Sequence, residues 1–334
     1  MSRAIIHIGP HKTGTTYIQS MLTANGEALA KEGVRYAVED DPSGFAHHEL
    51  AELLKTNKFD AGAVASRLQP HGAETVVLSS ENFSRLSKEE WDRFLELLSH
   101  EYSQIDVIAY LRSKSDVLYS WWQERVKFGF SHSFPHFLAQ ALMKPYANPQ
   151  INLAHLLGRI DRTKLKTLSI VSYDGLVASS SDLFSDFLTE VLSLPADKFS
   201  FTGKKINQSI EIKTLEILRG LNFLYEARRK RPATVKLRSS FLNRQETDPK
   251  FREITKSMSK RIEPLLCTID VQPIDENYAF LDQALAKNFP GCVRGSIWKD
   301  SAQFYPDRDA NLKPFLDGRH LLKADFRKDL EGLF

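Results

Sequence analysis

A glycine-rich loop near the start of the chain carries residues suited to binding an anion. In AIIHIGPHKTGTTYIQSML (residues 4–22), Gly9 and Gly14 keep the glycine spacing of the phosphate-binding pattern G-x-x-x-x-G-K-[ST]. Thr15 and Thr16 follow, but the lysine, Lys12, stands inside the loop. Backbone amides at the start of a helix here would point at one spot and favour an anion. The alternative is a tight strand-to-helix turn with incidental glycines.

Three further polar side chains stand where predicted strands end. Glu81 follows ETVVLSS (74–80), Arg112 follows IDVIAYL (105–111), and Tyr173 ends KLKTLSIVSY (164–173). Ligands of an open parallel sheet bind beyond the carboxyl ends of its strands, so we expect these side chains to converge with the loop on one rim. Taken singly, Glu81 could be a solvated turn residue and Tyr173 could cap the core.

These residues need a framework, and the apolar pattern predicts one. Short apolar runs alternate with segments of helical spacing, which predicts βαβ units and a mostly parallel sheet. The second half of the chain reads as largely helical. The fold class is therefore α/β, with a central mostly parallel sheet and a largely helical C-terminal part. We predict strands at 4–8, 74–80, 105–111 and 164–173; helices at 14–31, 46–56, 61–68, 88–100 with Ser87 as N-cap, 114–128, 180–193 and 210–230; a mainly helical 240–290; and an irregular 296–320.

The composition is that of an ordinary globular protein and excludes some classes. Of the 334 residues, 42% are hydrophobic and 26% charged, and the net charge of +3 falls short of a dedicated nucleic-acid binder. The two cysteines, Cys267 and Cys292, have no metal-type spacing. Without a leader or a long apolar run, the chain is expected to be cytoplasmic.

The surroundings of the loop argue against a metal-dependent nucleoside triphosphatase. Such enzymes hold magnesium with help from an aspartate at the end of a neighbouring strand. Here the neighbouring strand ends in SSEN, and the lysine has moved. Both departures suggest a transferred group that carries less charge than a terminal phosphate, handled without a metal.

At this point two motifs resemble a known family, the sulfotransferases that use 3′-phosphoadenosine 5′-phosphosulfate (PAPS). HKTGTT (11–16) is similar to their phosphosulfate loop P-K-[ST]-G-T-T, with His11 in place of proline. YLRSKSDVLYSWW (110–122) is similar to their 3′-phosphate motif, with Arg112, Asp116 and Ser120 at matching positions. FTGKKINQS (201–209) is a looser match to a third donor-contacting loop, and the R-K-G-x-x-G-x-W-K segment of the phenol sulfotransferases is absent. The chain is most similar to the bacterial carbohydrate-type branch.

The resemblance implies a P-loop-type three-layer fold, with a donor-binding core at 1–225 and a helical extension at 226–334 that binds the acceptor or packs on the core. Lys12 would neutralise the leaving oxygen of PAPS, and Glu81 would be the general base, with His11, His47 and His48 as rivals. The acceptor would be a carbohydrate or glycolipid hydroxyl or amine. The implied donor-binding residues are Lys12, Thr13, Gly14, Thr15, Thr16, Arg112, Ser120, Tyr173, Lys204 and Lys205.

Other interpretations stay open. A P-loop small-molecule kinase, or a non-catalytic nucleotide-binding protein, would also suit the loop. The basic run ARRKRPATVKLR (227–238) is either a solvated loop or a grip on an anionic glycan or a lipid-linked acceptor at a membrane surface. No nucleic-acid partner is expected.

Overall fold

The computed structural model describes residues 2–9, 12–38, 44–148, 151–201, 210–294, 312–321 and 323–333. By its contacts the chain falls into two compact units, each built from three stretches. The first comprises Met1–Lys114, Tyr146–Asn207 and Asn277–Asp300, and the second Ser115–Pro145, Gln208–Glu276 and Ser301–Phe334. These bounds differ from the predicted boundary between 225 and 226, because the chain crosses between the units several times.

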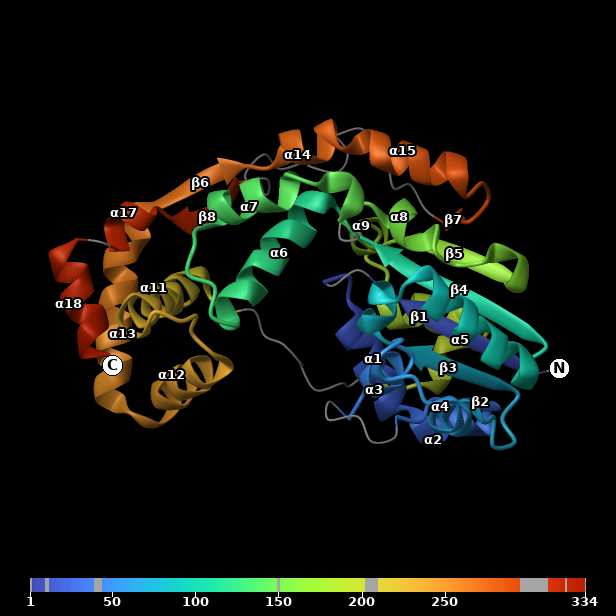
Figure 1. Cartoon of the computed structure of the whole chain (residues 1–334). Coiled ribbons are helices and arrows are strands. Elements are labelled where there is room, and N and C mark those ends of the chain that lie inside the picture. Colours follow the sequence, from blue (N-terminus) through green and yellow to red (C-terminus); the bar gives the residue numbers. More distant parts are fainter. Residues whose placement is uncertain are drawn as a thin grey trace. The chain divides into compact units, whose positions relative to one another are not determined.

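The first unit is built on a six-stranded parallel sheet with the order β2-β3-β1-β4-β5-β7 (Figure 1). The predicted α/β class is confirmed, and all four predicted strands are present. The two short edge strands, β2 and β7, were not predicted, because two residues make no readable pattern. The strands are β1 (Arg3–Ile8), β2 (Val34–Arg35), β3 (Thr75–Ser79), β4 (Gln104–Leu111), β5 (Thr167–Ser172) and β7 (Val293–Arg294).

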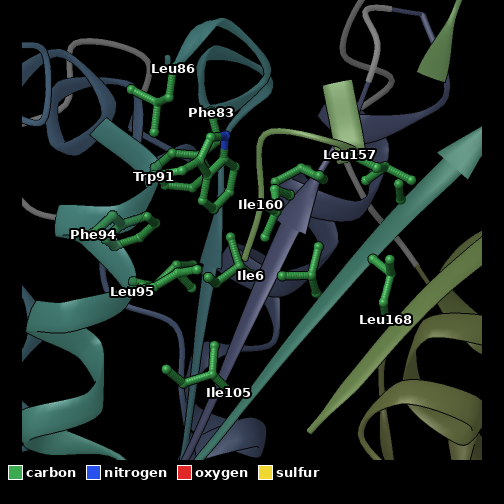
Figure 2. Packing of buried hydrophobic residues seen from close by; sticks show 14 of the residues in the cluster. Ile6, Phe83, Leu86, Trp91, Phe94, Leu95, Ile105, Leu157, Ile160 and Leu168 are labelled. Atoms are coloured by element: carbon green, nitrogen blue, oxygen red, sulfur yellow. The ribbon is translucent and has the colours of Figure 1, made fainter. Parts of the chain in front are cut away.

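Helices cover both faces of this sheet, which gives three layers. Alternate residues of β1 enter two separate cores, since Ile6 and Ile8 join one cluster and Ile5 the other. Figure 2 shows the first core, where Phe83 and Trp91 pack near Ile6. Its helices are α3 (His48–Leu53), α4 (Ala61–Leu68), α5 (Lys88–Glu101), α8 (Leu153–Leu157) and α15 (Ala279–Asn288); the other core takes α1 (Thr15–Ala24), α2 (Gly26–Lys31) and α10 (Leu183–Asp186).

Local chemistry explains where these helices begin and end. Ser87 caps α5 as predicted, in a reciprocal capping box with Glu90. The predicted helix 14–31 is instead two helices, because Asn25 interrupts it: its Nδ2 donates to the carbonyls of Met21 and Ser200. The predicted helix 180–193 is α10 followed by a π-helical turn, Phe187–Val191.

The second unit is mainly helical and has a core of its own. A buried ion pair between Arg219 and Glu216 ties α11 to β8, since Arg219 donates to the Leu316 carbonyl and Glu216 accepts from the Leu316 amide. The strand β6 interrupts the segment 240–290, which was predicted to be mainly helical. The segment 296–320 was predicted to be irregular, but β8 and α17 begin within its described part. The elements are α6 (Lys114–Lys127), α7 (Phe134–Leu142), α11 (Ile212–Arg229), α12 (Val235–Thr247), α13 (Pro249–Ile262), β6 (Leu266–Asp270), α14 (Gln272–Asn277), β8 (Leu312–Leu316), α17 (Gly318–Leu321) and α18 (Ala324–Gly332), with α6 and α14 reaching across the bounds of the units.

None of the helices in the described ranges combines the length and apolar character that crossing a membrane requires.

Candidate functional site

The described part of the loop between β1 and α1 contains two left-handed residues, Lys12 and Gly14. Gly14 is the N-cap of α1 in the left-handed conformation (φ 80°) and has no side chain with which to cap the helix. The N-cap residue therefore supplies no side-chain acceptor to the first amides of α1. Lys12 is also left-handed, with φ 74°. A non-glycine residue rarely adopts this conformation, and such strain concentrates at binding sites.

The two glycines of the loop are steric requirements of the fold. A Cβ atom on Gly14 would lie 2.3 Å from Leu183 Cδ2 and 3.1 Å from Tyr173 Cε2. One on Gly9 would lie 2.6 Å from Thr15 Cγ2. The two glycines thus let the loop pack closely at the end of the sheet, as both an anion-binding loop and a tight strand-to-helix turn require.

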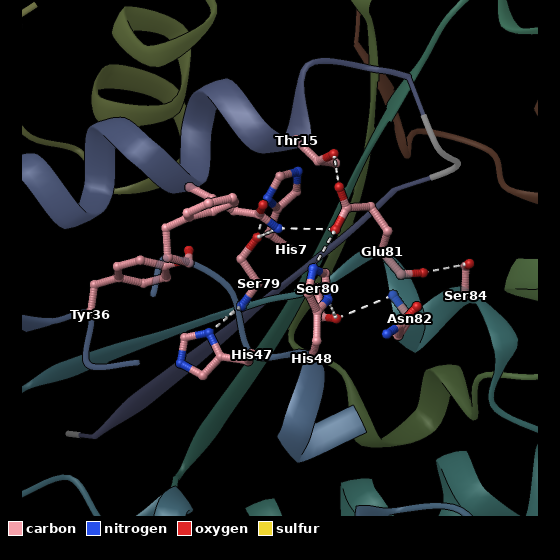
Figure 3. Close-up of polar contacts among 12 residues, drawn as sticks. His7, Thr15, Tyr36, His47, His48, Ser79, Ser80, Glu81, Asn82 and Ser84 are labelled. Atoms are coloured by element: carbon pink, nitrogen blue, oxygen red, sulfur yellow. Dashed lines mark hydrogen bonds and ion pairs between the residues drawn. The ribbon is translucent and has the colours of Figure 1, made fainter. Parts of the chain in front are cut away.

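Glu81 lies directly under the loop, as its position after β3 predicted. Its carboxylate accepts from Thr15 Oγ1 at 2.5 Å and from Gln19 Nε2 at 3.3 Å (Figure 3). Its Oε2 lies 3.7 Å from His48 Nε2. The side chain is nearly buried, with 8% of the residue exposed. Burial opposes ionisation, but the Thr15 hydrogen bond leads a set of contacts that together lower the pKa of Glu81, so the group is an anion at neutral pH.

Buried polar side chains of α1, β3 and β1 form a hydrogen-bonded chain that holds Glu81 in place. Gln19 lies one helical turn after Thr15, so both face the carboxylate, and Gln19 also donates to Ser79 Oγ at 3.1 Å. Ser79 Oγ is 2.8 Å from His7 Nδ1. His7 is fully buried, and this burial lowers its pKa to about 4, against a smaller opposite effect of Glu81. The neutral His7 ring therefore completes the support without adding charge.

The two histidines that open α3 have different surroundings. His48 points its Nε2 at Glu81, and its Nδ1 lies 2.8 Å from Ser80 Oγ, which fixes the ring. His47 instead accepts a hydrogen bond from the Ser79 amide at 3.2 Å, and its ring packs edge-on against Tyr36. Of the rival bases, His48 thus lies next to the Glu81 carboxylate, whereas His47 accepts a hydrogen bond from the backbone at the end of β3. His11 lies outside the described residues.

Arg112 joins the end of β4 to the loop. Its Nη1 donates to the Lys12 carbonyl at 3.3 Å, and its guanidinium lies 5.3 Å from the centre of the Tyr173 ring. The Arg112 Nε is 3.8 Å from Asp174 Oδ1, and Asp174 Oδ2 accepts from the Ser113 amide at 2.5 Å. The ends of β1, β4 and β5 therefore meet here. Because β1 lies between β3 and β4, this is the point where the strand order reverses, and open α/β sheets bind ligands at such a point.

The remaining predicted donor residues are not shown to contact the loop and Arg112 as a group. Ser120 is half-buried on α6 and belongs to the second unit, where Asp116 pairs with Lys313 at 2.6 Å. Lys204 and Lys205 fall outside the described residues. Thr13 is buried in the loop, and Thr16 is partly exposed in the first turn of α1. The roles of these residues stay predictions.

Sequence reasoning missed two residues that organise the site. Gln19 could have been found, because it follows Thr15 at the four-residue spacing that places side chains on one helix face. Asp174 carried a weaker signal, since it directly follows Tyr173 in SYDG. The Asp174 carboxylate can accept from the Ser113 amide only because β4 pairs with β5, and no local pattern reveals this pairing.

Within the part of the chain that the structure describes, no three His, Cys, Asp or Glu side chains form a group that could hold a metal ion. Comparison with protein-family models gives no match, and neither does comparison with curated proteins. Among solved structures, the sulfotransferase domain from the curacin biosynthetic pathway is similar over 63% of this chain and 81% of that domain, with 13% identity and a TM-score of 0.32.

Proposed function

We propose that the protein is a sulfotransferase that moves the sulfuryl group of PAPS to an acceptor. One observation carries the proposal: the position that lysine takes in G-x-x-x-x-G-K-[ST] is held by Thr15, whose hydroxyl is bound to Glu81. The loop lysine is Lys12 instead, on a strained backbone beside Arg112. A loop arranged in this way differs from the G-x-x-x-x-G-K-[ST] pattern and resembles the phosphosulfate-loop motif of the family, with His11 in place of proline.

The residues present fit the two anionic ends of the donor. The uncapped first turn of α1 and the Lys12 ammonium would receive the phosphosulfate, where a helix N-terminus favours negative charge. Arg112 offers a planar fork suited to the 3′-phosphate. Tyr173 adds an aromatic face next to it. Thr13, Ser120, Lys204 and Lys205 are the further donor contacts that we propose from the motifs.

Glu81 is the group that we assign to accept the proton of the acceptor. Its lowered pKa keeps it ionised at neutral pH, and Thr15, Gln19 and His48 fix its orientation. Transfer itself needs positioning and charge neutralisation, which Lys12 and the loop amides supply as the bond to the leaving oxygen breaks. The alternative base is His48. In that case the Glu81 carboxylate would only orient the His48 ring, and His48 would accept the proton.

Donor binding provides the decisive experiment. 3′-Phosphoadenosine 5′-phosphate should raise the melting temperature, whereas AMP, which differs only in lacking the 3′-phosphate, should not. Arg112→Ala should remove most of this difference, and Arg112→Lys should keep part of it because it keeps the charge without the fork. Equal stabilisation by ATP, with magnesium-dependent turnover, would instead establish the kinase alternative.

For the acceptor we propose a carbohydrate or glycolipid hydroxyl or amine, and for the reaction a metal-independent in-line transfer. The family branch that the motifs resemble supports this assignment. Incubation with labelled PAPS and a panel of glycans, glycolipids and phenols tests it. Labelling of phenols alone would contradict it, and the same panel assayed with a chelator tests the independence from metal.

A further inference from the structure

Four consecutive cations, Arg228, Arg229, Lys230 and Arg231, lie exposed where α11 ends. Lys230 is left-handed (φ 51°) and closes the helix, so the chain turns within this run. Arg228 pairs with Glu331 at 3.1 Å, and Arg231 donates to Tyr225 Oη at 3.3 Å. Cations are common at the C-terminus of a helix, where they complement its dipole, so charge alone assigns no role to the turn.

Two exposed apolar side chains flank these cations. Val235, just beyond the turn, is 43% exposed, and Phe128, in the loop after α6, is 53% exposed. Side chains of this size are stabilised when they are transferred fully from water to an apolar medium. We define the six residues Phe128, Arg228, Arg229, Lys230, Arg231 and Val235 as the basic–apolar surface.

The fold holds the two loops of this surface together. Gly129 (φ 102°) approaches the chain so closely that a Cβ on it would lie 2.1 Å from the Ala233 carbonyl oxygen. Asn222 of α11 donates to the carbonyls of Val126 and Phe130, at 2.7 and 3.1 Å, which fixes the turn that carries Phe128. The turn that carries Phe128 and the chain segment after α11 are therefore held side by side within the second unit.

We propose that the basic–apolar surface docks on an anionic phospholipid bilayer. Arginine and lysine attract anionic headgroups, while their apolar stems and an exposed aromatic ring lie in the interface. A polyanionic glycan would use the cations but leave Phe128 and Val235 in water, so the apolar residues favour the bilayer. The proposal concerns the second unit alone and does not depend on the reaction.

Vesicle sedimentation tests the proposal on the full chain. We expect binding to phosphatidylcholine vesicles that contain phosphatidylserine, weak binding to phosphatidylcholine alone, and a decrease with salt. Each headgroup-facing cation contributes roughly a factor of five, so Arg229→Gln with Lys230→Asn should weaken binding about 25-fold. Asparagine tolerates the left-handed position of Lys230. The matched control, Lys256→Gln with Lys260→Gln on exposed positions of α13, removes two charges and should change little.

The apolar half has its own variant. Phe128→Ser should weaken vesicle binding roughly tenfold. The loss should persist at high salt, because salt does not screen the contact between the bilayer and an inserted aromatic ring. Met143→Ser, at another exposed position of the second unit, is its control. Absence of vesicle binding, or equal effects of test and control variants, would overturn the proposal. Heparin binding that needs the cations but not Phe128 would assign the surface to a glycan. The thermal response to 3′-phosphoadenosine 5′-phosphate, measured in parallel, separates failure here from failure of the proposed function.

Discussion

Replacing Lys12 by glycine should relieve backbone strain and, at the same time, strongly lower turnover. The residue holds φ 74°, which costs an L-amino acid about 1–2 kcal/mol. Glycine avoids this cost but gains about 0.4–1 kcal/mol of entropy in the unfolded chain. The backbone contribution to the free energy of unfolding should therefore rise by about 0.5–1 kcal/mol. The lost ammonium should lower kcat about 10²–10³-fold, the usual effect of one donor aimed at developing charge.

Lys12→Ala separates the two effects. Alanine also removes the ammonium but keeps the backbone strain, so its turnover should match that of the glycine variant while its stability stays below it by about 1 kcal/mol. Urea unfolding of the three proteins gives the stabilities, and steady-state transfer from PAPS gives kcat and donor KM. Two results would refute the reasoning: a glycine variant no more stable than the alanine variant, or normal kcat with only a raised donor KM.

Three further perturbations address the surroundings of the loop. Glu81→Gln should lower turnover roughly 10²–10⁴-fold with donor binding nearly intact, and an equal loss of donor binding, measured by thermal shift, would exclude a base role. Gly14→Ala should destabilise the fold and abolish donor binding, because the new Cβ meets Leu183 in a left-handed backbone; unchanged melting would contradict this. His7 is neutral in the fold down to a pKa of about 4, whereas the unfolded chain takes up a proton near pH 6.5. Stability should therefore fall by about 3 kcal/mol as pH drops from 6.5 to 4, and urea titrations of His7→Leu should lack this component.

The sequence predicted the central sheet and the rim residues well because both depend on local signals. An apolar run such as AIIHI predicts a buried strand, and the strand end then predicts the position of the side chain that follows it. Glu81, Arg112 and Tyr173 were found in this way, and the structure brings all three to the loop.

What the sequence did not reveal depends on contacts between distant segments. Asn25 breaks a helix whose apolar spacing continues, because its side chain reaches Ser200. Asp174 finds its role only when β5 pairs with β4. The division into units is a further case: each unit joins stretches that are far apart in the chain, and no composition change marks the crossings.

The edge strand β7 has a consequence for how the protein is made. It joins β5 in the sheet, yet about 120 residues separate Ser172 from Val293. At roughly 5–20 residues per second of synthesis, the edge of β5 waits on the order of 6–24 s on the ribosome for its partner. During that interval an unpaired strand edge is open to wrong pairing. A chain released before residue 293 would keep β1, β3, β4 and β5 with the loop between β1 and α1, but with a permanently open edge.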